Sequence, residues 1–187
     1  MVVHMLRRHL GERLFRKGLA LYVKRFFGRA AETHELKIAF EDATGVPLDG
    51  FVEQWLYDRG HPELKISSSH DKRLGVCTLK IEQTQDKKSN REVFCFDLDI
   101  DVLDAKGKAQ RVTIPVNERS TAYNFSCKNA PKAVVIDPDY SLLCTISWTG
   151  KEAKAWLHQL AHAKGYLARK RALSALSKHL HKDSVRK

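Results

Sequence analysis

Residues 60–66, GHPELKI, decide the fold because two hydrophobic periods meet there. Before this stretch, apolar residues such as Leu6 and Leu10 return every three or four positions, which is typical of helices with one buried face. After it, apolar residues such as Leu64 and Ile66 alternate with polar ones, which is typical of strands. The sequence therefore predicts a helical segment followed by a sheet.

The segment before this boundary, residues 1–62, is predicted to be a small helical subdomain. Gly11 and Gly18 are expected to mark turns or helix ends. Thr33 is expected to cap a helix that stops at Gly45. The apolar faces are too broad for so few helices to cover, so we expect this segment to self-associate or to need a partner.

The segment after the boundary, residues 63–148, is predicted to be an antiparallel β-sandwich of several short strands. A turn is expected at residues 86–90. Asp97, Asp99 and Asp101 resemble the start of a calcium loop, but no glycine or closing glutamate follows at the required spacing. We therefore place these acids on the polar face of an alternating strand.

The last segment, residues 149–187, returns to the helical period and is predicted to be a helical hairpin. Thr149 is the expected N-cap of its first helix, and Gly165 is expected to separate the two helices. The fold class is thus mixed α and β with several units. A hairpin with unfilled apolar stripes is also typical of the start of a helical array.

The formal net charge of +11 raises the possibility of nucleic-acid binding, so its distribution matters. Residues 149–187 hold 10 Lys/Arg against 2 Asp/Glu, whereas the other two segments are nearly balanced. A basic module that binds nucleic acid or protein is therefore the alternative function. We do not favour it, because only Trp156 and Tyr166 could stack on bases there. The basic residues of the tail are Lys164, Arg169, Lys170, Arg171, Lys178, Lys182, Arg186 and Lys187.

The pattern closest to a metal motif is His158-Gln159-Leu160-Ala161-His162. Two histidines four residues apart share one helix face, as in the zinc motif H-E-x-x-H, where the glutamate is the general base. Gln159 cannot take a proton from metal-bound water, and no glutamate follows as a third ligand. We therefore predict no catalytic, cofactor-binding or metal-binding residue in this chain.

The cysteines and the hydropathy pattern bear on the cellular environment. Cys77, Cys95, Cys127 and Cys144 are widely spaced, and we expect free thiols in a reducing compartment, the cytoplasm. No apolar run approaches the roughly 20 residues that span a bilayer, and the N-terminus has no signal-peptide pattern. We therefore expect no membrane span.

Several short stretches in series resemble the end of the catalytic domain and the following domain of the aminopeptidase N (gluzincin) family. Their order and spacing carry the resemblance, although no single stretch is specific. A later stretch, residues 135–143, resembles the last strands of the family's β-sandwich. The matching stretches in the first third are residues 1–7, Leu10-Gly11, Phe15, Thr33, Phe51, Gln54-Trp55, Gly60-His61-Pro62 and residues 63–66.

The resemblance implies that residues 1–62 end a thermolysin-like catalytic domain, residues 63–148 form the sandwich and residues 149–187 begin a HEAT-like domain. It also implies that the family's zinc helix, amine-binding loop and catalytic tyrosine precede Met1. The chain would then open inside a family helix, through a truncated reading frame or a gene-model boundary. The parent enzyme would use zinc and cleave peptides, while this chain alone would be inactive.

Overall fold

The structure is a computed structural model that describes residues 1–86, 88, 91–127 and 129–184, with side chains described up to residue 178. The expected turn at 86–90 and the basic residues Lys182, Arg186 and Lys187 fall wholly or partly outside the described residues and side chains. Two compact units are present. Unit 1 comprises Met1–His61 with Lys88 and Arg91, and unit 2 comprises Pro62–Asp86 and the described residues from Glu92 onward.

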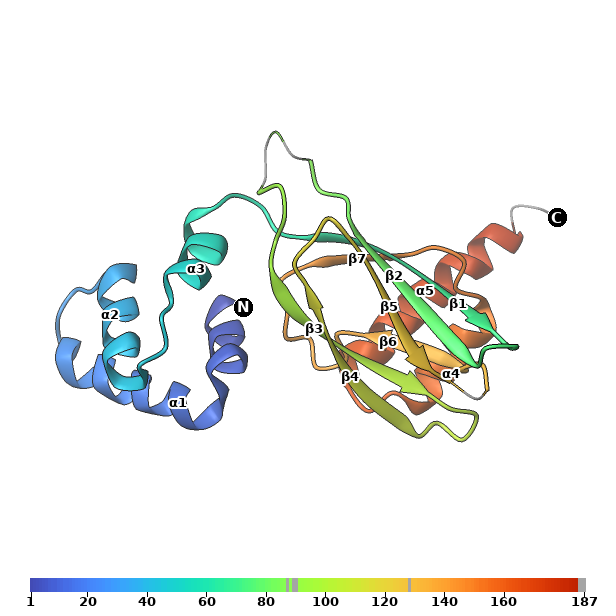
Figure 1. Cartoon of the computed structure of the whole chain (residues 1–187), viewed down its shortest axis with the longest axis horizontal. Helices are drawn as coiled ribbons and strands as arrows, with labels where there is room; N and C mark the ends of the chain where they lie inside the picture. Colours follow the sequence, from blue (N-terminus) through green and yellow to red (C-terminus); the bar gives the residue numbers. More distant parts are fainter. Residues whose placement is uncertain (87, 89–90, 128, 185–187) are drawn as a thin grey trace. The chain divides into compact units, whose positions relative to one another are not determined.

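Unit 1 is helical, as predicted, and its helices are labelled in Figure 1. Helix α1 is interrupted at Gly11, where φ is 74° and ψ is 160°, values that a glycine adopts without strain. Helix α2 ends at Gly45, which adopts the left-handed conformation and whose N–H bonds to Glu41 O. The elements are α1 (Val2–Phe26), α2 (Thr33–Thr44), α3 (Asp49–Val52) and the π-helical turn η1 (Glu53–Tyr57).

Two details of unit 1 differ from expectation. Gly18 lies inside α1 and does not end the helix. Its lack of a side chain is needed for packing, since a Cβ there would meet the ring of Phe40 at 2.2 Å. The N-cap of α2 is Glu32 and not Thr33. Glu35 explains the shift, since its carboxylate accepts the Glu32 N–H at 2.8 Å and satisfies one of the donors at the helix start.

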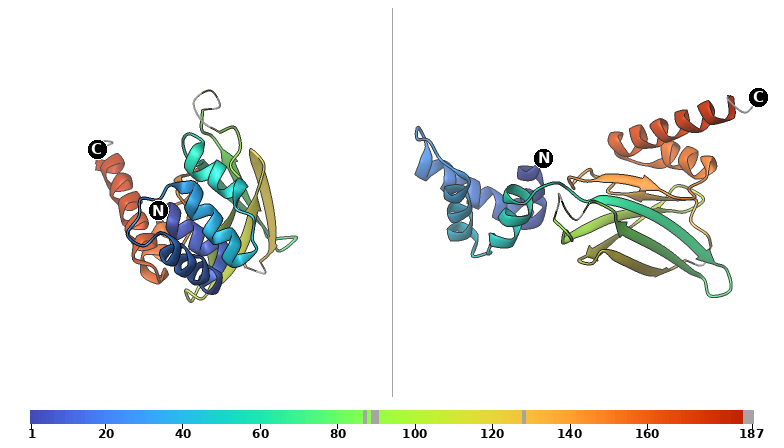
Figure 2. Two further views of the ribbon diagram at one scale, coloured as in Figure 1. Left: turned by 90° about the vertical axis from the view of Figure 1, so that its left-hand side faces the viewer. Right: turned by 90° about the horizontal axis from the view of Figure 1, so that it is seen from above.

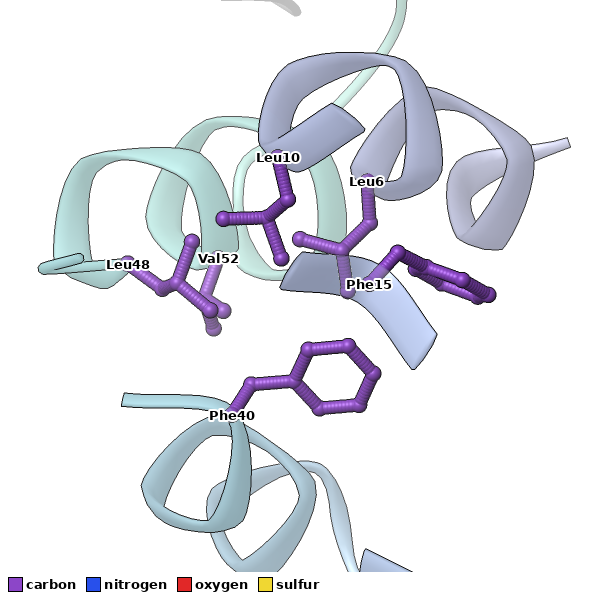
Figure 3. Close-up of a cluster of buried hydrophobic side chains, with 6 residues drawn as sticks. All are labelled: Leu6, Leu10, Phe15, Phe40, Leu48 and Val52. Carbon is purple, nitrogen blue, oxygen red and sulfur yellow. The ribbon is translucent and has the colours of Figure 1, made fainter. Parts of the chain in front are cut away.

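The core of unit 1 is a small cluster of apolar side chains, in which the rings of Phe15 and Phe40 lie 5.6 Å apart between centroids (Figure 3). Close approach of α1 and α2 at Gly18 lets the Phe40 ring lie against the α1 backbone. The six buried members of the cluster are Leu6, Leu10, Phe15, Phe40, Leu48 and Val52.

Unit 2 contains two sheets and two helices, which Figure 1 colours from green to red. The four-stranded sheet has the order β5-β2-β1-β7 and the three-stranded sheet the order β4-β3-β6. All neighbouring strands are antiparallel except β1 and β7, which run parallel. The strands are β1 (Glu63–Asp71), β2 (Val76–Gln83), β3 (Phe96–Leu103), β4 (Ala109–Val116), β5 (Ser120–Ser126), β6 (Ala133–Ile136) and β7 (Thr145–Trp148).

The alternation read from the sequence sets the buried face of each sheet. Ile66 pairs with Ile81 across β1 and β2, and Leu98 pairs with Ile114 across β3 and β4. All four side chains are at most 1% exposed. Because side chains on a strand alternate in direction, their polar neighbours point the other way, which gives each sheet one apolar and one wetter face.

Helices α4 (Ala153–His162) and α5 (Tyr166–Ser184) lie on one side of the strands in both views of Figure 2. They pack on β6, all four residues of which are buried. Val134 pairs with Val102 on one face of the sheet, while Ala133 and Val135 join Leu103 and residues of the helical hairpin on the other. Strand β6 is therefore covered on both faces.

The hairpin also departs from expectation at its start. Its first helix has Glu152 as N-cap, three residues after the expected Thr149. The backbone N–H of Thr149 instead bonds to Ile66 O at 2.8 Å, which extends the pairing of β7 with β1. Gly165 separates α4 from α5 as predicted, and its position is crowded, since a Cβ there would lie 2.7 Å from Pro138 O.

Candidate functional site

The histidine pair on α4 lies side by side, with ring centroids 4.4 Å apart, but each ring has a structural role. His158 Nε2 is 2.8 Å from Asp104 O. The ring of His162 lies against Gly107, where an added Cβ would meet Nδ1 at 2.2 Å. Both histidines therefore pack on the β3–β4 turn.

Gln159, the residue between them, is 1% exposed and forms a buried hydrogen-bond bridge. Its amide nitrogen donates to Ala168 O at 2.8 Å, and its amide oxygen accepts from Lys151 Nζ at 2.6 Å. A glutamine supplies one donor and one acceptor here, which a glutamate could not do in its ionised form. The residue joins α4 to α5 and to the loop before α4.

The three aspartates of β3 lie on its polar face, as predicted, and two of them bind Arg111 of β4. Arg111 Nε lies 2.5 Å from Asp101, and its Nη1 lies 3.7 Å from Asp99 and 2.6 Å from Asp139. Hydrogen bonds to Asp101 and Asp139 raise the pKa of Arg111. This cluster is an ion-pair network of the surface.

The four cysteines are free, as expected. Burial, together with the neighbouring Cys127, raises the pKa of Cys77 to about 12. Burial and the charge of Asp137 raise the pKa of Cys144 to about 12. Because the thiolate is the reactive form of cysteine, neither thiol is activated as a nucleophile at neutral pH.

The group with the most altered chemistry is Lys151, in the short loop between β7 and α4. Its Nζ lies 3.9 Å from the ring centroid of Trp156 and 4.6 Å from that of Trp148, two rings that meet edge to face. It donates to Val134 O at 2.7 Å as well as to Gln159. Burial, and secondarily the charge of Arg171, lowers the pKa of Lys151 to about 7.

Lys151 lines an open groove of about 540 Å³ formed by β7, the loop before α4, and α5. Arg171 reaches the same groove from α5, where its Nη1 donates to Ile136 O at 2.7 Å. We call this cavity the Lys151 groove. Its lining comprises Ile146, Ser147, Trp148, Gly150, Lys151, Trp156, Arg171, Ser174, Ala175 and Lys178.

The sequence offered only a weak signal for this groove. Between Gly150 and Glu152, Lys151 looks like an ordinary charged residue at a helix start. The usable signal was the pair of tryptophans at 148 and 156, which flank the lysine and supply flat apolar walls for a cation.

The basic residues of the last segment whose side chains are described differ in their surroundings. Lys164, Arg169 and Lys170 are exposed, whereas Arg171 is half-buried and turns toward Ile136 O and the ring of Tyr140, 5.5 Å from its centroid. One basic residue of α5, Arg171, therefore makes its contacts within unit 2.

Unit 1 carries an apolar groove of about 290 Å³, which we call the unit 1 groove. Val3 and Leu56 line it and are 61% and 42% exposed. The complete lining is Val2, Val3, Leu6, Tyr22, Ala31, Glu32, Thr33, Leu36, Leu48, Phe51, Val52 and Leu56. Apolar area of this kind is typical of a surface that another protein surface covers.

In the part of the chain that the structure describes, no three or more His, Cys, Asp or Glu side chains gather where they could hold a metal ion. A zinc site needs three or four such ligands, so the His158 and His162 pair does not fit one. No helix of the described residues has the length and apolarity to cross a membrane.

The family model and the curated proteins that this chain resembles are all aminopeptidases or peptidases of the M1 type. Residues 1–55 match the family model described as the peptidase family M1 domain. The chain is 28% identical over 191 residues to aminopeptidase N of Escherichia coli, a match that covers 94% of this chain and 21% of that protein. It is 32% identical over 91 residues to aminopeptidase M1-A of Oryza sativa, covering 49% of this chain and 10% of that protein.

A solved structure, aminopeptidase A of Legionella pneumophila in complex with aspartic acid, has the same fold. It aligns with a TM-score of 0.80 and 18% identity, over 98% of this chain and 21% of that chain. The chain thus spans about a tenth to a fifth of the length of the relatives that it matches. The fold class predicted from the sequence, helical, sandwich and helical in order, is confirmed by this likeness.

Proposed function

Because this chain belongs with the C-terminal part of the M1 aminopeptidases, we propose that it is a non-catalytic portion of a zinc-dependent aminopeptidase. The whole enzyme would remove N-terminal residues from peptides. Zinc would activate water there, with a carboxylate as general base. This chain would supply structure behind that site and no catalytic group.

The observation that carries the proposal concerns unit 1. The family match falls on residues 1–55, within unit 1, yet the described side chains assemble no zinc ligand set. A segment related in sequence to a zinc peptidase but without zinc ligands fits a supporting part of the domain. On this proposal, residues 1–62 end the catalytic domain, 63–148 form the sandwich domain and 149–187 begin a HEAT-like domain.

The proposal is tested by zinc content and by hydrolysis of aminoacyl-arylamide substrates. The purified chain is expected to hold well under one zinc per molecule after dialysis and to release no arylamine. Hydrolysis that a chelator abolishes and added zinc restores would contradict the proposal, because it would require a metal site in this chain. A full-length family member, assayed in parallel, is the positive control.

We also propose that the unit 1 groove is the surface through which the chain meets its partner. The partner is the catalytic part of the enzyme or, without it, a second copy of this chain. Apolar residues that line the groove and remain exposed, such as Val3 and Leu56, support this. A dye that fluoresces on apolar surfaces should bind the chain, and binding should fall when Val3 and Leu56 are both changed to serine.

Two further properties complete the proposal. The four free thiols support residence in a reducing compartment, the cytoplasm. Nucleic-acid binding is not proposed, because Arg171 is engaged inside unit 2 and the exposed Arg169 and Lys170 are what a solvated helix face would show. A gel shift with DNA or RNA that weakens steeply as salt rises would reverse that judgement.

A further inference from the structure

We propose that the Lys151 groove of unit 2 binds a small organic oxyanion, a carboxylate or phosphate monoester joined to a flat apolar body. This inference concerns only unit 2 and is independent of the proposed function. It rests on three properties of the groove, namely its cations, its aromatic walls and its size.

Three cationic side chains, those of Lys151, Arg171 and Lys178, line the groove. Within the residues whose side chains the structure describes, no ion pair joins Lys151, Arg171 or Lys178 to a carboxylate. Lys151 Nζ uses two of its three donors, on Val134 O and Gln159 Oε1, and Arg171 uses one of five, on Ile136 O. Donors therefore remain on both side chains for an oxyanion.

The burial of Lys151 makes such a ligand favourable. A buried ammonium without a counter-charge is disfavoured, which is why the pKa of Lys151 falls to about 7, with Arg171 acting in the same direction. An oxyanion in the groove would reverse both effects. Besides Lys151, the charged residues that line the groove are Arg171 and Lys178, both from α5, and of these Arg171 acts on the pKa of Lys151. Helix α4 contributes only Trp156 to the lining, and β6 and β7 contain no charged residue.

The walls and the volume specify the rest of the ligand. Trp148 and Trp156 supply the aromatic lining, and flat apolar groups pack well on indole rings. A volume of about 540 Å³ falls within the range of small-molecule pockets. Ser174 adds a hydroxyl group to the lining for a polar substituent, whereas the Ser147 hydroxyl donates to Leu64 O at 3.2 Å.

The test measures how fast each lysine of the chain is reductively methylated at pH 7, by peptide mass spectrometry, with three probes. Benzoate and phenyl phosphate carry the oxyanion, and benzyl alcohol is the neutral match. At least one of the two anions should slow methylation of Lys151 about tenfold at millimolar concentration, and the effect should saturate as the anion concentration rises. Lys154, which is exposed and paired with Glu152, should be unaffected. Protection by only one of the anions identifies the oxyanion as carboxylate or phosphate.

Two variants and a control complete the experiment. Lys151→Met and Arg171→Met should each weaken binding of the protecting anion about tenfold, measured by calorimetry, because each removes donors to the oxyanion. Lys170→Met, an exposed neighbour on α5, should leave binding unchanged. The proposal is overturned if neither anion protects Lys151, or if benzyl alcohol protects equally. The protection assay uses the unaltered chain, so it decides the matter even if a variant does not fold.

Discussion

The sandwich of unit 2 and the helices of unit 1 bury their large apolar side chains to different degrees. Among the described strands β1 to β7, no large apolar side chain is well exposed. In the helical unit 1, Val3, Val23, Phe27 and Tyr57 are between 48% and 85% exposed. Two facing sheets cover each other, whereas so few helices leave apolar faces open.

The same contrast recurs inside unit 2. The hairpin covers β6 with its inner face, but Leu157, Tyr166 and Leu173 on its helices are 55%, 69% and 58% exposed. The strands thus leave no large apolar side chain well exposed, whereas the helices of both units keep exposed apolar side chains that further structure could cover. Exposed apolar faces of this kind agree with the proposal that the chain is a portion of a longer enzyme.

The largest expected effect tests how little core unit 1 has. Phe40→Ala removes an aromatic side chain of the cluster that is 1% exposed, and should cost about 3–5 kcal/mol of stability. The total free energy of unfolding of so small a unit is little larger than this loss, so unit 1 should unfold. Hydrogen exchange of peptides from α1 and α2 should become fast.

Ile100→Ala in β3 is the matching change in unit 2. Ile100 is fully buried, so a similar loss of about 2–5 kcal/mol is expected, yet the larger core should keep the strands folded. Rapid exchange throughout the strands of this variant, or slow exchange in α1 of Phe40→Ala, would break the comparison.

A pair of glycines tests the close packing of α1 on α2. Alanine usually stabilises a helix relative to glycine, but at Gly18 its Cβ would clash with the Phe40 ring. Gly18→Ala should therefore lose about 1–3 kcal/mol. Gly50→Ala, where no atom lies within 4 Å of the added Cβ, should gain up to about 1 kcal/mol. Thermal unfolding compares the two, and the account fails here if both are stabilised.

A pH series tests the burial of Lys151. The unfolded chain keeps the Lys151 proton up to its ordinary pKa of 10.5, whereas the folded chain releases it near 7. Between these values the unfolded state binds more protons, so the free energy of unfolding should rise with pH, by at most about 1.4 kcal/mol per pH unit. This contribution is constant below pH 7.

Lys151→Met should remove that slope, and Lys154→Met, an exposed control, should keep it. Denaturant unfolding at about pH 7, 7.5 and 8 measures the slope. Cysteines of the unfolded chain, with an ordinary pKa of about 8.5, contribute equally in all three proteins, so their effect cancels when the slopes are compared. Equal slopes in the unaltered chain and Lys151→Met would show that the lysine is not held in a buried, charge-disfavouring site.

The smallest expected effect concerns Arg111 and the β3 aspartates. Arg111 is 41% exposed, so its ion pairs are screened by water, and Arg111→Gln should cost about 1 kcal/mol or less. Added calcium should leave the melting temperature of the unaltered chain unchanged, because Asp99 and Asp101 are already paired with Arg111. A rise with calcium would restore the calcium-loop interpretation of Asp97, Asp99 and Asp101.

The sequence was most informative where the hydrophobic period was regular. The change at residues 60–66, the strand alternation around Ile100 and the break at Gly165 all reappear in the structure. It was least informative where a contact distant in the sequence decides the local structure. Gly18 looked like a helix end until Phe40 gave it a packing role, and Thr149 looked like a cap until β1 used its N–H.

The candidate site shows the same limit. The predicted lack of a zinc motif followed from local spacing, which a sequence displays directly. The Lys151 groove joins β7, the loop before α4, and α5, and the depressed pKa of its lysine depends on burial that no local pattern encodes. Only the paired tryptophans pointed to it.

Sedimentation velocity of three proteins tests most directly whether unit 1 carries a surface that needs covering. The unaltered chain is expected to associate reversibly as its concentration rises. The double variant Val3→Ser with Leu56→Ser, which makes the unit 1 groove polar, should remain monomeric. Leu74→Ser, a control at a residue of unit 2 that is 75% exposed, should associate like the unaltered chain. A monodisperse monomer for the unaltered chain at every concentration would contradict the account.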